Sequence, residues 1–278
     1  MTLFARFLYL AVCTVAVTGC GGEGIDLSAF AESRVRGEFE RTLPVNGPVD
    51  LSVRTGSGDV DIRVGPGDRV RVVGRITAGN SLFGDPALER VRGVEAAPPI
   101  EQKGNVIRIG DTHDDPRYQN ISISYELIVP ANTRVTSRTG SGDQLIGRLN
   151  GAVSAKAGSG DIEIEGAGGG LDAQAGSGDI RAKAVGGAVR VQVGSGDIDV
   201  VQIAKGDVDV RAGSGDVRVI LPADAAVTLT ARAGSGSIET THPIEVQGKR
   251  RRNRLEGTIR GGGNRVDITT GSGSIQIQ

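Results

Sequence analysis

The stretch KAGSGDIEIEGAGGGLDAQAGSGDIRAKA (residues 156–184) repeats nearly the same eighteen residues twice. From Gly140 onward, the steps between successive Gly-Ser-Gly triplets are 18, 18, 18, 19, 21 and 37 residues. A sustained period of this length is typical of a solenoid, in which each repeat packs only against its neighbours. The triplets begin at Gly56, Gly140, Gly158, Gly176, Gly194, Gly213, Gly234 and Gly271.

Small aliphatic residues alternate with polar ones on both sides of each triplet. Val153, Ala155 and Ala157 precede one triplet, and Ile162 and Ile164 follow it. Alternation with a period of two indicates a strand that buries one face. Each period therefore predicts two short strands and two turns.

The outward charges distinguish a flat meander from a stack of coils. In five successive periods, a charged residue stands one position after the first aliphatic residue that follows the triplet. The sign of its charge alternates from one period to the next. Opposite charges on neighbouring strands contribute roughly 0.2–1 kcal/mol to stability. Only stacking in register would make these residues neighbours. They are Glu163, Arg181, Asp199, Arg218 and Glu239. We therefore predict an all-β fold, a single-stranded parallel β-helix (β-solenoid) with two short strands per roughly 18-residue coil and roughly nine to twelve coils.

The N-terminus has the features of an export signal. Arg6 precedes the apolar run FLYLAVCTVAV (7–17), and VTGC (17–20) resembles the bacterial lipobox. We expect a lipoprotein signal peptide at 1–19, a lipidated Cys20 and a Gly-rich tether through residue 37; an ordinary signal peptide cleaved nearby is the alternative. Because Gly21 follows the cysteine, the resemblance implies the outer membrane if the cell is Gram-negative, and a second acyl chain makes a durable anchor.

The remaining chain divides into two regions. Residues 38–139 are predicted to form an irregular N-terminal β region, with a short helix near 86–92 because DPALERVR (85–92) offers an Asp cap followed by proline. Residues 140–278 are predicted to form the regular solenoid, interrupted by a basic insertion at 241–264. Whether that insertion is a coil or a loop stays open.

Composition excludes several classes of function. The formal charge of −1 argues against nucleic-acid binding by bulk electrostatics. Only His113 and His242 could supply imidazole, and no GxSxG, HExxH or phosphate-binding loop occurs, so we expect no cofactor and no catalytic residues. A polysaccharide-active β-helix enzyme is the less favoured alternative, because no aromatic sugar platform lies between residues 126 and 278. Its carboxylates would be Glu163, Glu165, Asp172 and Asp199.

The Asp of each corner has two interpretations. It could accept a local backbone hydrogen bond in an Asx-type turn, or the stacked row could hold calcium. At about 4.8 Å spacing, neighbouring carboxylates repel by roughly 0.9 kcal/mol even in water, and Arg138, Lys156 and Arg211 could compensate. We favour the turn because Ser237 and Ser274 replace Asp in the last two triplets. The calcium alternative uses Asp143, Asp161, Asp179, Asp197 and Asp216.

The segment KRRRNR (249–254) carries five positive charges in six residues. Such runs are usually solvated surface, which is the interpretation we favour. The alternative is a contact for an anionic partner such as a phosphorylated lipid or an acidic polysaccharide. Its residues are Lys249, Arg250, Arg251, Arg252 and Arg254.

Residues 38–278 resemble a bacterial family of β-strand-repeat lipoproteins with GSGD turns, labelled "putative adhesins", whose function is largely unassigned. The resemblance rests on FERTLPVNGPVDLSVRTGSGDVDI (39–62), YELIVPANTRVTSRTGSGD (125–143), the repeated turns and RVDITTGSGSIQIQ (265–278). It implies a single-stranded β-helix and a non-catalytic, adhesin-like module of the cell envelope. The implied partners are the membrane, through the lipid anchor, and surface glycans or envelope proteins.

Overall fold

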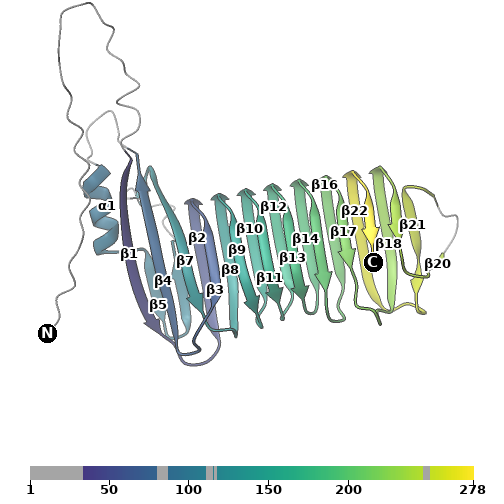
Figure 1. The fold of residues 1–278 in the computed structure, drawn as a ribbon, viewed down its shortest axis with the longest axis horizontal. Coiled ribbons are helices and arrows are strands. Elements are labelled where there is room, and N and C mark those ends of the chain that lie inside the picture. Colours follow the sequence, from purple (N-terminus) through teal and green to yellow (C-terminus); the bar gives the residue numbers. More distant parts are fainter. Residues whose placement is uncertain (1–33, 80–86, 111–114, 116–117, 247–250) are drawn as a thin grey trace, which may run out of the picture. The chain divides into compact units, whose positions relative to one another are not determined.

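The computed structural model describes residues 34–79, 87–110, 115, 118–246 and 251–278. These residues form two large β-sheets around one hydrophobic core (Figure 1). Sheet A has eleven strands in the order β1-β4-β7-β3-β9-β11-β13-β15-β17-β23-β19, and sheet B has twelve in the order β20-β21-β18-β22-β16-β14-β12-β10-β8-β2-β6-β5. The all-β, solenoid-like prediction is confirmed.

Each Gly-Ser-Gly corner joins a strand of sheet B to a strand of sheet A, and we call this strand–corner–strand unit a coil. In the regular part, sheet B contributes β8 (Thr133–Ser141), β10 (Val153–Ser159), β12 (Leu171–Ser177), β14 (Val189–Ser195) and β16 (Val208–Ser214). Sheet A contributes β9 (Gln144–Leu149), β11 (Ile162–Ala167), β13 (Ile180–Val185), β15 (Ile198–Gln202) and β17 (Val217–Ile220).

Equivalent residues of successive coils are register partners in parallel strands. Glu163 pairs with Arg181, Arg181 with Asp199, and Asp199 with Arg218. Successive side chains point to opposite faces of a strand, so the positions between these charges face inward, where Ile162, Ile180 and Ile198 are almost fully buried. The predicted neighbourhood of alternating charges is therefore present along these four strands.

The two glycines of a corner meet different requirements. A Cβ atom on Gly158, the first glycine, would lie 2.5 Å from the carbonyl oxygen of Gly140 in the neighbouring coil. Gly160, the second glycine, has a φ of 126°, a conformation that side-chain-bearing residues rarely adopt. One glycine thus permits close approach of backbones, and the other permits the turn.

Beyond the first coil, five strands and a helix extend the N-terminal end of the stack. β2 (Val49–Ser57) and β3 (Val60–Val64) form the first coil, beside β8 and β9. On sheet A, β7 (Ile121–Val129) pairs with β3 in parallel and with β4 (Arg69–Ala78) antiparallel, and β1 (Val35–Pro44) pairs antiparallel with β4. On sheet B, β6 (Val106–Ile109) follows β2, and β5 (Ile100–Lys103) forms the edge.

Helix α1 (Ala87–Ala96) packs against β1 and β4. It buries Ala87, Val91 and Val94. Gly37 of β1 leaves room for it, because a Cβ atom there would lie 2.4 Å from Cγ1 of Val91. Within the described residues no helix is long and apolar enough to cross a membrane.

The last coil of the sequence is not the last coil of the stack. β22 (Asn264–Ser272) lies between β16 and β18 (Val227–Ser235), and β23 (Ile275–Ile277) lies between β17 and β19 (Ile238–Thr240). After β19 the chain forms β20 (Glu245–Val246) and β21 (Arg254–Ile259), which runs antiparallel along β18. The prediction that Arg218 and Glu239 are neighbours is therefore wrong, because Gln276 lies between them.

The stack has eight corner-containing coils in the described residues, fewer than the nine to twelve that we predicted. Two physical reasons account for the difference. Much of the N-terminal region pairs antiparallel, so β1, β4 and β5 do not belong to coils. The described residues of the 37-residue step form the antiparallel strands β20 and β21 and no further coil.

Candidate functional site

The corner aspartates form a hydrogen-bonded ladder between coils. The backbone N–H of Asp161 donates to Oδ1 of Asp143 at 2.9 Å, and the N–H of Asp179 donates to Oδ1 of Asp161 at 2.8 Å. In the same way, the N–H groups of Asp143, Asp197 and Asp216 donate to Oδ1 of Asp59, Asp179 and Asp197, respectively, at 2.8–3.0 Å. Each carboxylate therefore satisfies a backbone donor of the next coil, and such bonds to charged acceptors are stronger than neutral ones.

Two details of the predicted corner are wrong. The bond is not local to its own turn, because the donor belongs to the neighbouring coil, which stacks close enough to place its N–H beside the carboxylate. The basic residues before the corner do not compensate the aspartates either, since no ion pair within 4 Å joins the two sets in the described residues. Arg181, which follows its corner, contacts Asp179 at 2.6 Å and Asp161 at 4.0 Å.

The two serine corners lie together at the end of the ladder. The N–H of Ser274 donates to Oδ1 of Asp216 at 2.7 Å, so the serine coil receives the last bond of the row. Ser274 lies next to Ser237 in the stack, since β22 and β23 pair with β18 and β19. The row of aspartate acceptors therefore ends where the serine corners begin.

The five aspartates of the calcium alternative are neighbours, but one oxygen of each accepts a backbone hydrogen bond. In the part of the chain that the structure describes, no group of three acidic, histidine or cysteine side chains converges on one point. Calcium takes six to eight oxygen ligands. The ladder as built presents backbone donors to the carboxylates.

The carboxylates of the enzyme alternative do not share a site. Glu163, Glu165 and Asp199 belong to sheet A, whereas Asp172 belongs to β12 of sheet B. Lys183 donates to Glu165 at 2.7 Å and to Glu163 at 2.9 Å. These hydrogen bonds, with Glu165 the stronger contributor, raise the pKa of Lys183 above its ordinary value. Glu163 and Glu165 are thus held by Lys183 in an exposed cluster of ion pairs.

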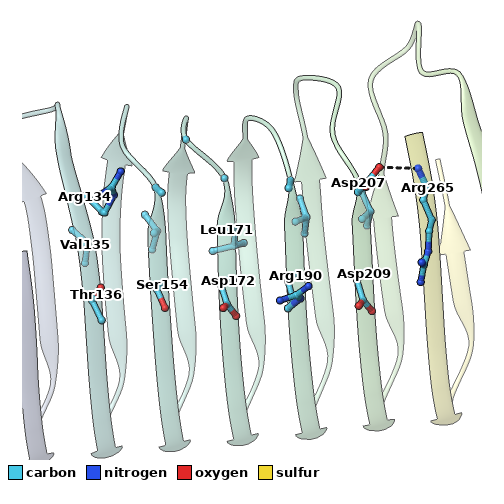
Figure 2. Close-up of a pocket in the computed structure, with 17 residues that line it drawn as sticks. Arg134, Val135, Thr136, Ser154, Leu171, Asp172, Arg190, Asp207, Asp209 and Arg265 are labelled. Atoms are coloured by element: carbon cyan, nitrogen blue, oxygen red, sulfur yellow. Dashed lines mark hydrogen bonds between the residues drawn. The ribbon is translucent and has the colours of Figure 1, made fainter. Parts of the chain in front are cut away.

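An open groove with a volume of about 550 Å³ crosses the outer face of sheet B (Figure 2). It runs over β8, β10, β12, β14 and β16 and reaches β22. Figure 2 shows its polar side chains in a row across neighbouring strands, with a hydrogen bond from the N–H of Arg265 to Oδ1 of Asp207. The polar lining consists of Arg134, Thr136, Ser154, Asp172, Arg190, Asp207, Asp209 and Arg265.

Charges of both signs line this groove. Arg190 is the register partner of both Asp172 and Asp209, yet no ion pair within 4 Å engages it among the described residues. Oδ1 of Asp209 is buried and accepts no hydrogen bond there, while its Oδ2 contacts Arg211 at 3.0 Å. The groove therefore offers the cation of Arg190, unpaired within the described residues, to a polar ligand.

Sequence reasoning missed this groove, although a signal was present. The residues just before three of its strands are small: Ala152, Gly170 and Ala188. The equivalent residues at its two ends are large and charged, Arg134 and Asp207. A row of small residues between charged ones leaves a hollow once the coils stack.

The predicted anionic-partner segment helps to cover the end of the stack. The carbonyl oxygen of Arg252 accepts from the N–H of Ile238 at 3.0 Å, and that of Asn253 accepts from Ala233 at 3.0 Å. Arg251 and Arg254 pair with each other as an isolated bridge, and Arg254 contacts Glu256 at 2.9 Å. Lys249 and Arg250 lie outside the described residues, as do the signal segment, Cys20 and His113.

Comparison with known proteins places the chain in a family. No curated protein matches it. A solved structure described as a "putative cell adhesion protein" from Clostridium sporogenes has 17% identity and a TM-score of 0.35, over 87% of this chain and 99% of its own. A "putative adhesin" from Bacteroides fragilis has 12% identity and a TM-score of 0.35, over 87% and 97%. The model of the Toastrack family, DUF4097, matches residues 33–278, and the chain therefore belongs to that family.

Proposed function

We propose that this protein is a non-catalytic, lipid-anchored interaction module of the cell envelope. The two-strand coil of about eighteen residues is the unit that repeats its binding surface. Its partners in this proposal are surface glycans or envelope proteins that extend along several coils. The anchor is Cys20, and the outer membrane is the expected location if the cell is Gram-negative.

The groove on sheet B is the observation that carries this proposal. Stacked coils place equivalent side chains about 4.8 Å apart, and extended surfaces of this kind suit elongated partners. Ser154, Asp172 and Arg190 lie in one register row along the groove. Such a row can form hydrogen bonds with successive units of a polymer. A catalytic cleft acts at one bond and does not require a row of equivalent groups.

The anchoring part of the proposal rests on the sequence. An apolar run after Arg6 ends in VTGC (17–20), and Cys20 is the residue that a lipobox would acylate. Residues 34–278 contain no cysteine, so no disulfide competes for this thiol within the solenoid.

A groove-filling variant tests the binding function. We expect the protein to retain envelope glycans or proteins in a pulldown, and we expect Ser154→Trp to reduce this retention because the indole fills the groove. Thr230→Trp is the matched control: Thr230 is in the same outward row on β18 but does not line the groove. Retention of nothing by the wild-type protein, or equal loss in both variants, would contradict the proposal.

A pair of cysteine variants tests the anchor. Cys20→Ser should move the protein from the membrane fraction to the soluble fraction and abolish incorporation of labelled fatty acid. Cys13→Ser should leave both measurements unchanged, because Cys13 lies inside the expected signal peptide. Unchanged lipid labelling of Cys20→Ser would show that this residue is not the anchor.

A further inference from the structure

A row of outward side chains on sheet B lies just before the corners and contains no acidic residue. We call it the basic row. Its members are neighbours on nine successive strands, from β2 through β18 to β21, and six of them are Arg or Lys. In stack order they are Arg54, Arg138, Lys156, Gln174, Gln192, Arg211, Thr269, Arg232 and Arg254.

In the C-terminal half of the basic row, each cation has a carboxylate partner. Arg211 contacts Asp209 at 3.0 Å. Arg232 and Arg254 both contact Glu256 at 2.9 Å. The charge of these side chains is therefore largely neutralised within the protein.

In the N-terminal half, Arg138 and Lys156 have no such partner. Among the described residues, no side-chain hydrogen bond and no ion pair within 4 Å engages either of them. The residues two positions earlier on the same face are hydroxyls: Ser52, Thr136 and Ser154. Adjacent like charges about 4.8 Å apart repel by roughly 0.9 kcal/mol in water, and among the described residues no carboxylate within 4 Å offsets that cost for Arg138 and Lys156.

The same end of the basic row borders a cavity of about 560 Å³. Arg54 and Arg138 line it, together with Thr139 and the side-chain-free Gly56 and Gly140. Asp115 and Tyr118 also contribute to its wall. The guanidinium group of Arg138, which borders this hollow, is suited to a carboxylate or another planar anion.

We propose that this face binds a linear acidic polysaccharide that runs across β2, β8 and β10. Its anionic groups lie against Arg138 and Lys156, and its hydroxyls lie against Ser52, Thr136 and Ser154. The inference rests on the proposed function and specifies its partner. The proposed surface overlaps the groove of sheet B at Thr136 and Ser154 and extends from there to the basic row.

A polysaccharide fits this surface better than a lipid bilayer does. Attachment to a membrane surface draws on buried apolar area as well as on charge. The exposed large apolar side chains of the described residues are Val64, Leu88, Val106, Leu145, Ile203 and Val246, and none of them lies on β2, β8 or β10. A narrow row of cations beside a row of hydroxyls matches a chain that carries both kinds of group.

The test measures binding to polygalacturonate, a linear polyuronate, with neutral dextran and anionic phosphatidylglycerol vesicles as comparisons. The double variant Arg138→Gln/Lys156→Gln should weaken polygalacturonate binding about fivefold or more, given the usual strength of exposed ion pairs. Added salt should weaken wild-type binding. The matched control is Arg211→Gln/Arg232→Gln, which removes two cations of the same row that already have partners; its affinity should stay within about twofold of the wild type.

Melting temperatures of both double variants establish that the fold is intact. Equal affinity losses in the two double variants, binding to dextran, or binding to vesicles without binding to polygalacturonate would overturn the inference. The two proposals fail separately. If the protein retains envelope material in the pulldown but binds no polygalacturonate, the acidic polysaccharide is wrong while the interaction function stands.

Discussion

Substituting Asp197 separates the hydrogen-bonding role of the corner aspartates from their charge. Oδ1 of Asp197 accepts from the N–H of Asp216 at 2.8 Å, and no ion pair engages Asp197 in the described residues. Asp197→Asn keeps an acceptor oxygen and removes the charge. Asp197→Ala removes both. The two variants therefore differ mainly in one inter-coil hydrogen bond.

The magnitudes follow from the spacing of the ladder. Repulsion between Asp197 and Asp216 is roughly 0.9 kcal/mol at about 4.8 Å in water. Repulsion from Asp179 is smaller, because Arg181 contacts that carboxylate at 2.6 Å. A hydrogen bond to a charged acceptor contributes about 1.5–3 kcal/mol and a neutral one about 0.5–1.5 kcal/mol. For the Asn variant, the relieved repulsion nearly cancels the weakening of the hydrogen bond. Its free energy of unfolding should therefore lie within about 1 kcal/mol of the wild type. The Ala variant, which loses the hydrogen bond, should be about 1 kcal/mol less stable than the Asn variant.

Thermal unfolding followed by circular dichroism measures this difference. About 1 kcal/mol corresponds to roughly 2–4 °C in a protein of this size. Added salt screens the repulsion, so the free energy of unfolding of the Asn variant should fall relative to that of the wild type as salt rises. Equal stability of Asn and Ala would refute the inter-coil hydrogen bond. A large loss for Asn as well as for Ala would show that the charge itself is needed, as a bound cation would require.

Two further predictions concern the corners. Gly158→Ala should lower stability by about 1–3 kcal/mol, because its Cβ would lie 2.5 Å from the Gly140 carbonyl oxygen. Gly56→Ala should be neutral or stabilising, since nothing lies within 4 Å of its Cβ; equal loss of melting temperature in both variants would contradict the stacking contact. Millimolar Ca²⁺ or a chelator should leave the melting temperature unchanged, since backbone N–H groups occupy Oδ1 of the corner aspartates; a rise with calcium would instead show that the folded chain binds it.

The repeat predicted the stacking because residues eighteen apart, such as Glu163 and Arg181, become register partners. It could not predict the place of the last coil. Val266 and Ile268 alternate like any other strand, and their pairing with Val208 and Val210 depends on the long return through β20 and β21.

The sequence predicted the role of the glycines in the corner, but it did not predict which backbone N–H donates to the aspartate. Positive φ and close approach follow from Gly-Ser-Gly itself, because only glycine meets both requirements. The donor for Asp161 could not be named from the sequence, since a local N–H and that of Asp179 in the next coil are equivalent until the coils stack. The groove was missed for the same reason, because Ala152, Gly170 and Ala188 form a hollow only when they are neighbours.

The order of coils is tested most directly by disulfide formation between engineered cysteines in residues 34–278, which contain none. Arg218 and Gln276 are register partners, so their Cα atoms lie within the range that a disulfide can bridge. Arg218 and Glu239 are separated by one strand, at about twice the inter-strand spacing. Arg218→Cys/Gln276→Cys should therefore cross-link on oxidation and Arg218→Cys/Glu239→Cys should not; the reverse result would show that the coils stack in the order of the sequence.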